Sequence, residues 1–331
     1  MNHEPCTSEA RQLATEIDRT GARLAEVRAA IGRVIFGQDT VIDQFLITLL
    51  AGGHALLIGV PGLGKTRLVE TIGTVTGLDT KRVQCTPDLM PADILGSEVL
   101  EESESGLREF RFIPGPVFCS FLMADEINRA SPRTQSALLQ AMQEHAVTVA
   151  GTRRLLPQPF HVFATQNPLE LEGTYPLPEA QLDRFLMEID IDYPGRDAER
   201  EMLVVTTGLD EEEPAGVLNS TELMAAQRLV RRIPVGESVV EAILDLVRSG
   251  RPDAPDGSSG ILWGPGPRAS QSLMLAVRAR ALLDQRLAPS VDDVLDLAGP
   301  VLRHRMQLTF AARADGVTLD EVIDRLKAPL G

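Results

Sequence analysis

Apolar residues in the first half of the chain follow two patterns, helical spacing and short runs. Spacings of three, four and seven residues predict an amphipathic helix over residues 8–31 and a second helix over 40–51. Short apolar or alternating segments, which are typical of strands, follow at residues 55–58, 82–85, 118–124, 160–165 and 186–191. Further helical patterns directly after residue 66, at 131–144 and at 178–185 separate most of these segments. Strands that alternate with helices predict an α/β domain with a parallel sheet.

The second half of the chain carries only helical patterns. The sequence DYPG at residues 192–195 marks a break, since Pro and Gly favour turns and linkers. The helices predicted after it cover residues 197–207, 221–232, 237–249, 268–284, 291–305 and 319–326. The pattern therefore predicts three parts: an N-terminal helix (residues 1–31), an α/β domain (32–193) and a small all-helical domain (194–331).

Two β-hairpins are predicted inside the α/β domain, in addition to the strands of its sheet. The first pairs residues 98–101 with 108–113 around a polar turn at 102–106, and the second pairs 146–149 with 153–156. A simple alternation of strands and helices does not contain such hairpins. We therefore interpret them as insertions into the domain.

The composition is that of a soluble globular protein. Of 331 residues, 44% are apolar and 24% are charged, and the formal net charge is −15. So acidic a chain lacks the clustered Lys and Arg that a large nucleic-acid footprint needs, and anionic membranes repel it. The N-terminus has no signal-peptide pattern, and no apolar stretch is long enough to span a bilayer. The three cysteines form no C-x-x-C pair, so the expected compartment is a reducing cytosol, and the localisation cytoplasmic.

Residues 59–66 read GVPGLGKT and fit the P-loop pattern G-x-x-x-x-G-K-[ST]. A predicted strand precedes the loop and a predicted helix follows it, which turns backbone N–H groups inward and aims a helix N-terminus at an anion. Lys65 would then reach the β- and γ-phosphates of ATP, and the Thr66 hydroxyl would hold Mg²⁺. The nucleotide-binding residues predicted here are Gly59, Val60, Pro61, Gly62, Leu63, Gly64, Lys65, Thr66 and Arg67.

An acidic pair, Asp125 and Glu126, directly follows the apolar run at 118–124. In open α/β sheets, ligands bind at the carboxyl ends of the strands. Asp125 would hold Mg²⁺ through water, and Glu126 would orient and polarise the attacking water molecule. An acidic pair on a solvated surface is the common alternative. Its place at the end of a buried strand favours the catalytic interpretation.

Three further polar residues carry weaker signals. Asn167 follows the segment 160–165, where its amide can hydrogen-bond a γ-phosphate and a water molecule, although a strand-ending Asn-Pro is also an ordinary turn. Arg184 lies near a predicted helix end, either as a charge that favours the helix dipole or as an arginine finger for a neighbouring subunit. Arg268 begins a helix after GPGP, from which it could reach the nucleotide from the second domain.

Taken in order, five segments resemble the AAA+ ATPases, and within them the MoxR family. They are GVPGLGKT, LMADEINRA, ATQNP, GTYPLPEAQLDRF and GPGPRAS, and the resemblance extends over residues 10–328. DEINRA, the helix SPRTQSALLQAMQEHAVTV and GTYPLPEAQLDRF point to this family in particular. The two hairpins are similar to those of the helix-2-insert group, which also holds magnesium chelatase and the MCM helicases.

The resemblance implies a role for each position. Asp125 and Glu126 match the Walker B pair, Asn167 matches sensor 1, Arg184 matches the arginine finger, Arg268 matches sensor 2, and Ile35, Phe36 and Gly37 match the segment beside the adenine. Relatives usually carry serine before the proline of sensor 2, where this chain has Gly266-Pro267. That departure leaves the fine geometry of the lid open.

The resemblance also implies a ring, typically hexameric, with ATP as substrate, Mg²⁺ as cofactor and a chaperone-like role. Its partner would be a protein with a von Willebrand factor A (VWA) domain, and its clients other protein complexes. A nucleic-acid motor is the main alternative, because Arg153-Arg154 in the second hairpin could track a phosphate backbone. A non-catalytic nucleotide switch is a third reading, against which the intact Glu126 argues. If Arg184 is not the finger, Arg129 and Arg133 are the next candidates.

Overall fold

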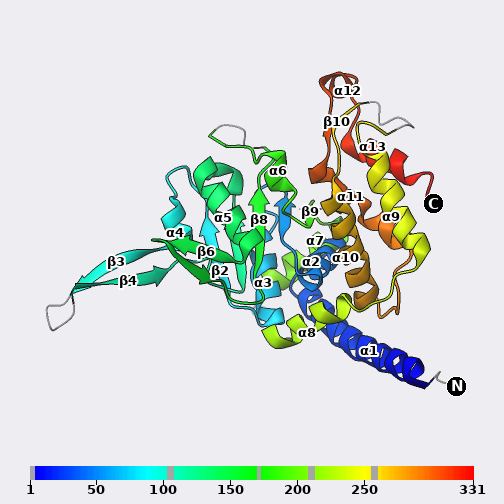
Figure 1. The fold of residues 1–331 in the computed structure, drawn as a ribbon, viewed down its shortest axis with the longest axis horizontal. Coiled ribbons are helices and arrows are strands. Elements are labelled where there is room, and N and C mark those ends of the chain that lie inside the picture. Colours follow the sequence, from blue (N-terminus) through cyan, green and yellow to red (C-terminus); the bar gives the residue numbers. More distant parts are fainter. Residues whose placement is uncertain (1–3, 103–107, 170–172, 208–212, 255–259) are drawn as a thin grey trace.

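A five-stranded parallel sheet forms the centre of the first domain in the computed structural model, which describes residues 4–102, 108–169, 173–207, 213–254 and 260–331 (Figure 1). The strand order is β2-β5-β8-β1-β9, and every neighbouring pair is parallel. The strands are β1 (Ala55–Ile58), β2 (Thr80–Gln84), β5 (Phe121–Asp125), β8 (His161–Gln166) and β9 (Met187–Asp190). This confirms the predicted α/β domain with a parallel sheet.

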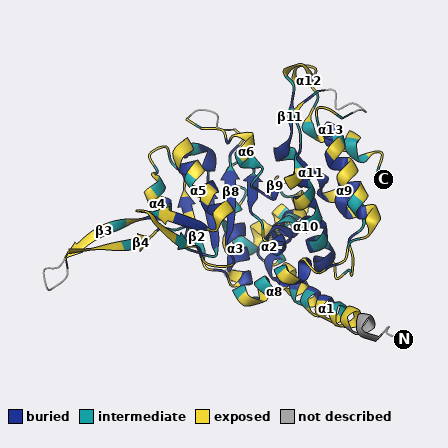
Figure 2. Ribbon diagram, in the orientation of Figure 1, coloured by how far each residue is buried: buried dark blue, intermediate teal, exposed yellow. Residues whose placement is uncertain are grey.

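Helices cover both faces of the sheet, because alternate residues of each strand point to opposite sides. On one face, Leu57 and Phe163 pack in a cluster with α1 (Glu4–Gly32), α2 (Asp39–Ala51) and α3 (Lys65–Thr76). On the other, Leu56 and Ala164 pack in a second cluster that includes α5 (Pro132–Glu144) and the short α4 (Pro91–Leu95). The central strands β1, β5 and β8 are accordingly mostly dark blue in Figure 2. With both faces buried, the sheet is a firm base for the residues that follow its strands.

The second domain is helical and lies to one side of the sheet (Figure 1). Its helices are α7 (Arg196–Thr206), α8 (Ser220–Val230), α9 (Glu237–Ser249), α10 (Pro267–Leu283), α11 (Val291–Leu302), α12 (Phe310–Ala314) and α13 (Leu319–Lys327), with a 3₁₀ turn η2 (Arg303–Arg305). One detail differs from the all-helical prediction: β10 (Ile261–Trp263) pairs antiparallel with β11 (Gln307–Leu308). Strands this short are below the length at which alternation is recognisable.

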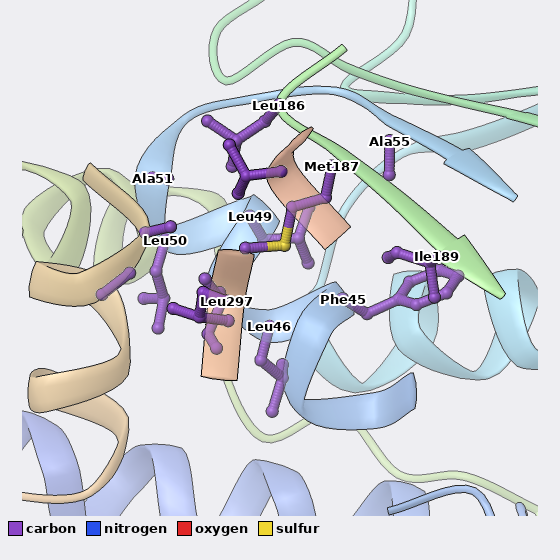
Figure 3. Packing of buried hydrophobic residues seen from close by; sticks show 14 of the residues in the cluster. Phe45, Leu46, Leu49, Leu50, Ala51, Ala55, Leu186, Met187, Ile189 and Leu297 are labelled. Atoms are coloured by element: carbon purple, nitrogen blue, oxygen red, sulfur yellow. The ribbon is translucent and has the colours of Figure 1, made fainter. Parts of the chain in front are cut away.

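The two domains share one hydrophobic core (Figure 3). Leu297 of α11 belongs to the same buried cluster as Leu50 of α2 and Met187 of β9, and the three lie together in the close view. The cluster also takes in Val27 of α1. The boundary predicted after residue 193 falls in the connector between β9 and α7, and packing is continuous across it.

The first predicted hairpin projects from the sheet (Figure 1), and the second lies at its base. They are β3 (Gly96–Glu102) with β4 (Arg108–Pro114), and β6 (Ala146–Val149) with β7 (Thr152–Leu155); residues 103–106 of the predicted turn lie outside the described residues. The Arg154 guanidinium joins them, 3.9 Å from the centre of the Phe112 ring and 3.3 Å from the Glu98 carboxylate. At the root of β4, a Cβ on Gly115 would lie 2.2 Å from the Ile94 carbonyl oxygen, so only glycine fits that crossing.

Two smaller findings concern the length of the helix before Arg184 and whether any described helix could span a membrane. The helix predicted over 178–185 is shorter, α6 (Glu179–Leu182), because the chain leaves it at Asp183 to enter β9. Among the described residues, no helix is long and apolar enough to cross a bilayer.

Candidate active site

The P-loop connects β1 to α3 at the carboxyl edge of the sheet. Gly62 and Gly64 have positive φ angles of 88° and 71°, which L side chains rarely adopt. A Cβ on Gly59 would lie 2.7 Å from the Ile191 carbonyl oxygen, so the loop can begin this close to the end of β9 only with glycine. The Lys65 ammonium donates to the Gly59 carbonyl, with 2.6 Å between Nζ and O. The lysine thus lies across the loop, where an anion bound by the backbone N–H groups would meet it.

Asp125 is the last residue of β5 and is almost fully buried. Its carboxylate accepts two short hydrogen bonds, one from the Thr165 hydroxyl at 2.6 Å and one from the positively charged Arg82 guanidinium at 2.6 Å. Burial, together with the negative charges of Asp125 and Glu126, raises the pKa of the neighbouring Cys85 thiol to about 12. The carboxylates therefore create a negative potential at this edge, which suits a bound cation.

Glu126 follows directly, with a left-handed backbone (φ 54°). Its N–H donates to the Thr165 hydroxyl at 2.8 Å, so one side chain on β8 holds both members of the acidic pair. The Glu126 carboxylate accepts from Gln84 Nε2 at 2.9 Å and lies 3.3 Å from Arg129. Arg129 thus faces the acidic pair of its own chain. No local pattern predicted Thr165 or Gln84, because their contacts join strands that are about forty residues apart.

Asn167 directly follows β8, the strand that lies between β1 and β5. Its side chain is nearly buried, and Oδ1 accepts the N–H of Leu169 at 3.1 Å. The two roles predicted for Asn167, in a turn and in contact with a phosphate, are therefore compatible. The turn uses the amide oxygen, and the two Nδ2 hydrogens are the donors that this side chain can offer to a phosphate.

Arg184 and Arg268 lie together, away from the P-loop. Both line a pocket of about 250 Å³ whose wall includes Gly53, the residue two positions before β1. The P-loop follows the other end of β1. Six residues of extended chain separate Gly53 from Gly59, which is about 20 Å at 3.3 Å per residue. The pocket that Arg184 and Arg268 line therefore lies towards the end of β1 opposite the P-loop.

Ile35, Phe36 and Gly37 lie next to the start of the P-loop. The Gln38 side chain donates to the Asp192 carbonyl at 2.8 Å, and Asp192 follows the residue that contacts Gly59. A Cβ on Gly37 would lie 2.4 Å from the Ala198 side chain of α7. The segment is therefore held between the end of β9 and the first helix of the second domain.

Comparison with known proteins identifies the family of this chain. Residues 54–187 match the ATPase family associated with various cellular activities (AAA), and residues 258–326 match the AAA lid domain. The protein "Chaperone MoxR1" of Mycobacterium tuberculosis is 40% identical over 328 residues, which cover 98% of this chain and 85% of that protein. The chain belongs to the MoxR family of AAA ATPases. "Protein MoxR" of Paracoccus denitrificans is 32% identical over 87% of this MoxR-family chain and 89% of its own length.

A solved structure extends the match to the whole fold. The crystal structure of a protein from Cytophaga hutchinsonii superposes with a TM-score of 0.87 at 35% identity, covering 97% of both chains. Membership in the AAA ATPases identifies this MoxR-family chain as a nucleotide-binding protein that hydrolyses ATP, in a family that is typically oligomeric.

The residues at the carboxyl edge fit a magnesium nucleotide. Hard oxygen ligands and phosphates are what Mg²⁺ prefers, and Asp125 and Thr66 offer a carboxylate and a hydroxyl. Within the described part of the chain, no group of three or more His, Cys, Asp or Glu side chains forms a cage for a metal.

Proposed function

We propose that this MoxR-family ATPase hydrolyses Mg²⁺-bound ATP at sites shared between two subunits of a ring. In this proposal Lys65 binds the phosphates, Thr66 and Asp125 hold Mg²⁺, and Glu126 polarises the attacking water. Asn167 senses the γ-phosphate from the strand between them.

The observation that carries the proposal is the separation of the two charged sets. The carboxylates and the P-loop lie at one edge of the sheet, whereas Arg184 and Arg268 lie near Gly53, before the other end of β1. About 20 Å of extended chain, from Gly53 to Gly59, lies between the pocket that both arginines line and the P-loop of the same chain. A neighbour placed against that edge would bring both arginines to a γ-phosphate, where a positive charge stabilises the transition state. The buried Arg184 Nε also has no acceptor among the described residues.

The ring is proposed to be hexameric and to drive chaperone-like remodelling or maturation of protein complexes. The name of the relative "Chaperone MoxR1" supports that role, and a VWA-domain protein is the proposed partner. A client protein, on which the ring would act, is proposed as a further partner. A reducing cytosol is the proposed compartment, which suits the reduced, buried Cys85 and Cys119.

The nucleic-acid alternative loses part of its support. Of the pair Arg153-Arg154 on which it rested, Arg153 is exposed, whereas Arg154 holds the two hairpins together through Glu98 and Phe112. The first hairpin is also rich in acid: Glu98, Glu101, Glu102 and Glu109 lie on its two strands. Such a surface repels a phosphate backbone.

The test uses three variants and two stimulants. Glu126→Gln should bind ATP and fail to hydrolyse it. Arg184→Ala should also bind ATP without hydrolysis, and mixing it with Lys65→Ala subunits should restore turnover, because each supplies the half of the site that the other lacks. Absence of restoration would refute the shared site. Stimulation of the wild-type ATPase by DNA, but not by a VWA-domain protein, would favour the motor instead.

A further inference from the structure

The lid contains an arginine that is fully buried. Arg305, in the turn η2, has 1% of its surface exposed. An arginine so far from water is costly unless every donor has a partner. Three of its hydrogen bonds go to the other domain: Nε donates to the Asp183 carboxylate at 2.8 Å, one terminal nitrogen to the Phe185 carbonyl at 2.6 Å, and the other to the Leu186 carbonyl at 3.1 Å.

These acceptors lie immediately before and after Arg184. The segment from Asp183 to Leu186 lies between α6 and β9, and its N–H groups donate to carbonyls of its own domain, in α6 and at His54. The adjacent His304 adds a contact between its Nε2 and the Phe185 carbonyl, at 3.1 Å. The backbone around Arg184 is therefore bonded to its own domain through its N–H groups and to two lid residues through its carbonyls.

The same cluster includes the second arginine of the pocket. The Asp183 carboxylate accepts from Arg305 on one oxygen, and its other oxygen lies 3.7 Å from the Arg268 guanidinium. Arg305 is itself held inside the lid, by the Val301 carbonyl at 2.5 Å and the Ser272 hydroxyl at 3.0 Å. Asp183 and Arg305 thus form one clamp that joins α10, α11 and the segment around Arg184.

We propose that Arg305 is a positioning residue for hydrolysis in the neighbouring subunit. It sets the position of Arg184 directly and that of Arg268 through Asp183, so the two arginines approach the neighbour's γ-phosphate as one unit whose orientation follows the lid. This inference rests on the proposed function, since it assumes that Arg184 acts on a neighbouring subunit's nucleotide. A planar fork that meets three acceptors at once is something that lysine cannot reproduce.

The first experiment compares Arg305→Lys with a matched control, Arg286→Lys. Arg286 makes a two-pronged pair with Asp293 at 2.6 and 2.8 Å inside the lid and forms no bond to the segment 183–186. Misplacing a charge by about 1 Å costs up to about 100-fold in rate. We therefore expect kcat of Arg305→Lys to fall 10- to 100-fold while the Kd for a fluorescent ATP analogue changes less than twofold, because the P-loop lies at the other edge. The control should keep kcat within about twofold.

The second experiment separates positioning from damage to the fold. Arg305→Lys subunits have an intact P-loop, and Lys65→Ala subunits have an intact Arg184. Mixing them should restore ATPase activity, whereas mixing Arg305→Lys with Arg184→Ala should not. If Arg305→Lys does not fold, Asp183→Asn replaces it, with the same expectations, since it weakens the hold on both arginines without changing shape.

Two results would overturn the inference. One is wild-type kcat in Arg305→Lys. The other is failure of the Arg305→Lys and Lys65→Ala mixture while the Arg184→Ala and Lys65→Ala mixture recovers, which would place the defect inside the mutated subunit. If the mixture of Arg184→Ala and Lys65→Ala also fails, the shared site itself is refuted. That result contradicts the proposed function and does not test the role of Arg305.

Discussion

Thr165 offers the sharpest test of how the acidic pair is held. It is fully buried on β8, and its hydroxyl donates to Asp125 at 2.6 Å while accepting the N–H of Glu126 at 2.8 Å. Valine has the same shape and lacks the hydroxyl. Thr165→Val therefore removes both hydrogen bonds without opening a cavity, and it leaves a carboxylate oxygen and a backbone N–H buried without these partners.

The expected loss in the free energy of unfolding follows from these two hydrogen bonds. A hydrogen bond to a charged group contributes about 1.5–3 kcal/mol, and an unsatisfied buried N–H costs about 1–3 kcal/mol. Allowing for partial relaxation, we expect the free energy of unfolding to fall by about 3 kcal/mol. The left-handed backbone of Glu126 also loses a contact that fixes it, so kcat should fall by at least about tenfold.

Urea unfolding and steady-state ATP hydrolysis measure the two effects, with Thr165→Ser as the control. Serine keeps the hydroxyl and loses one buried methyl group, which costs about 1 kcal/mol, and it should keep most of the activity. If valine destabilises the protein no more than serine does and leaves kcat unchanged, the two hydrogen bonds do not hold the acidic pair.

Three further predictions concern the loop, the pH dependence and the thiols. Lys65→Ala should raise the Kd for ATP by at least about 100-fold, measured by calorimetry, because it removes the one side-chain charge that the P-loop brings to the phosphates; unchanged binding would contradict the P-loop assignment. Burial and the Asp190 carboxylate, opposed by the Arg303 charge, raise the pKa of Glu188 to about 7. Because the folded pKa lies above the ordinary 4.5, this group's contribution to stability is full below pH 4.5 and is lost as the pH rises through 7. Glu188→Gln should therefore flatten the fall in unfolding free energy between pH 4.5 and 8, by up to about 3 kcal/mol, and an equally steep fall would disprove the assignment. Burial raises the pKa of the Cys85 and Cys119 thiols to about 12, so neither should react with a thiol reagent at pH 8 until the protein is unfolded; rapid reaction of either in the native state would contradict their burial.

The carboxyl edge of the sheet was predictable because parallel strands carry their following residues to one side. Gly59, Asp125 and Asn167 each come directly after or at the end of a strand, and their meeting needs only that the strands be parallel. The contact through Thr165 was not predictable, since it depends on β8 lying beside β5, which no local pattern encodes.

The position of Arg268 could not be predicted from the sequence, for a different reason. GPGPRAS indicates where a helix begins and says nothing about how the lid packs on the sheet. That orientation is set by long-range contacts, such as those of Leu297 with the cluster around Leu50 and Met187. Arg305 likewise reads as an ordinary charged residue near a helix end. Its burial is evident only once the segment 183–186 folds against it.

The close contact at Gly37 has a consequence for the timing of the cycle. The segment assigned to the adenine rests directly on Ala198, at the point where the chain has just left the sheet domain. With the base in the place proposed for it beside Phe36, the first turn of α7 lies next to its path, through Gly37. We therefore expect nucleotide exchange to be coupled to movement of α7, so that an agent that pins α7 in place should slow the release of ADP.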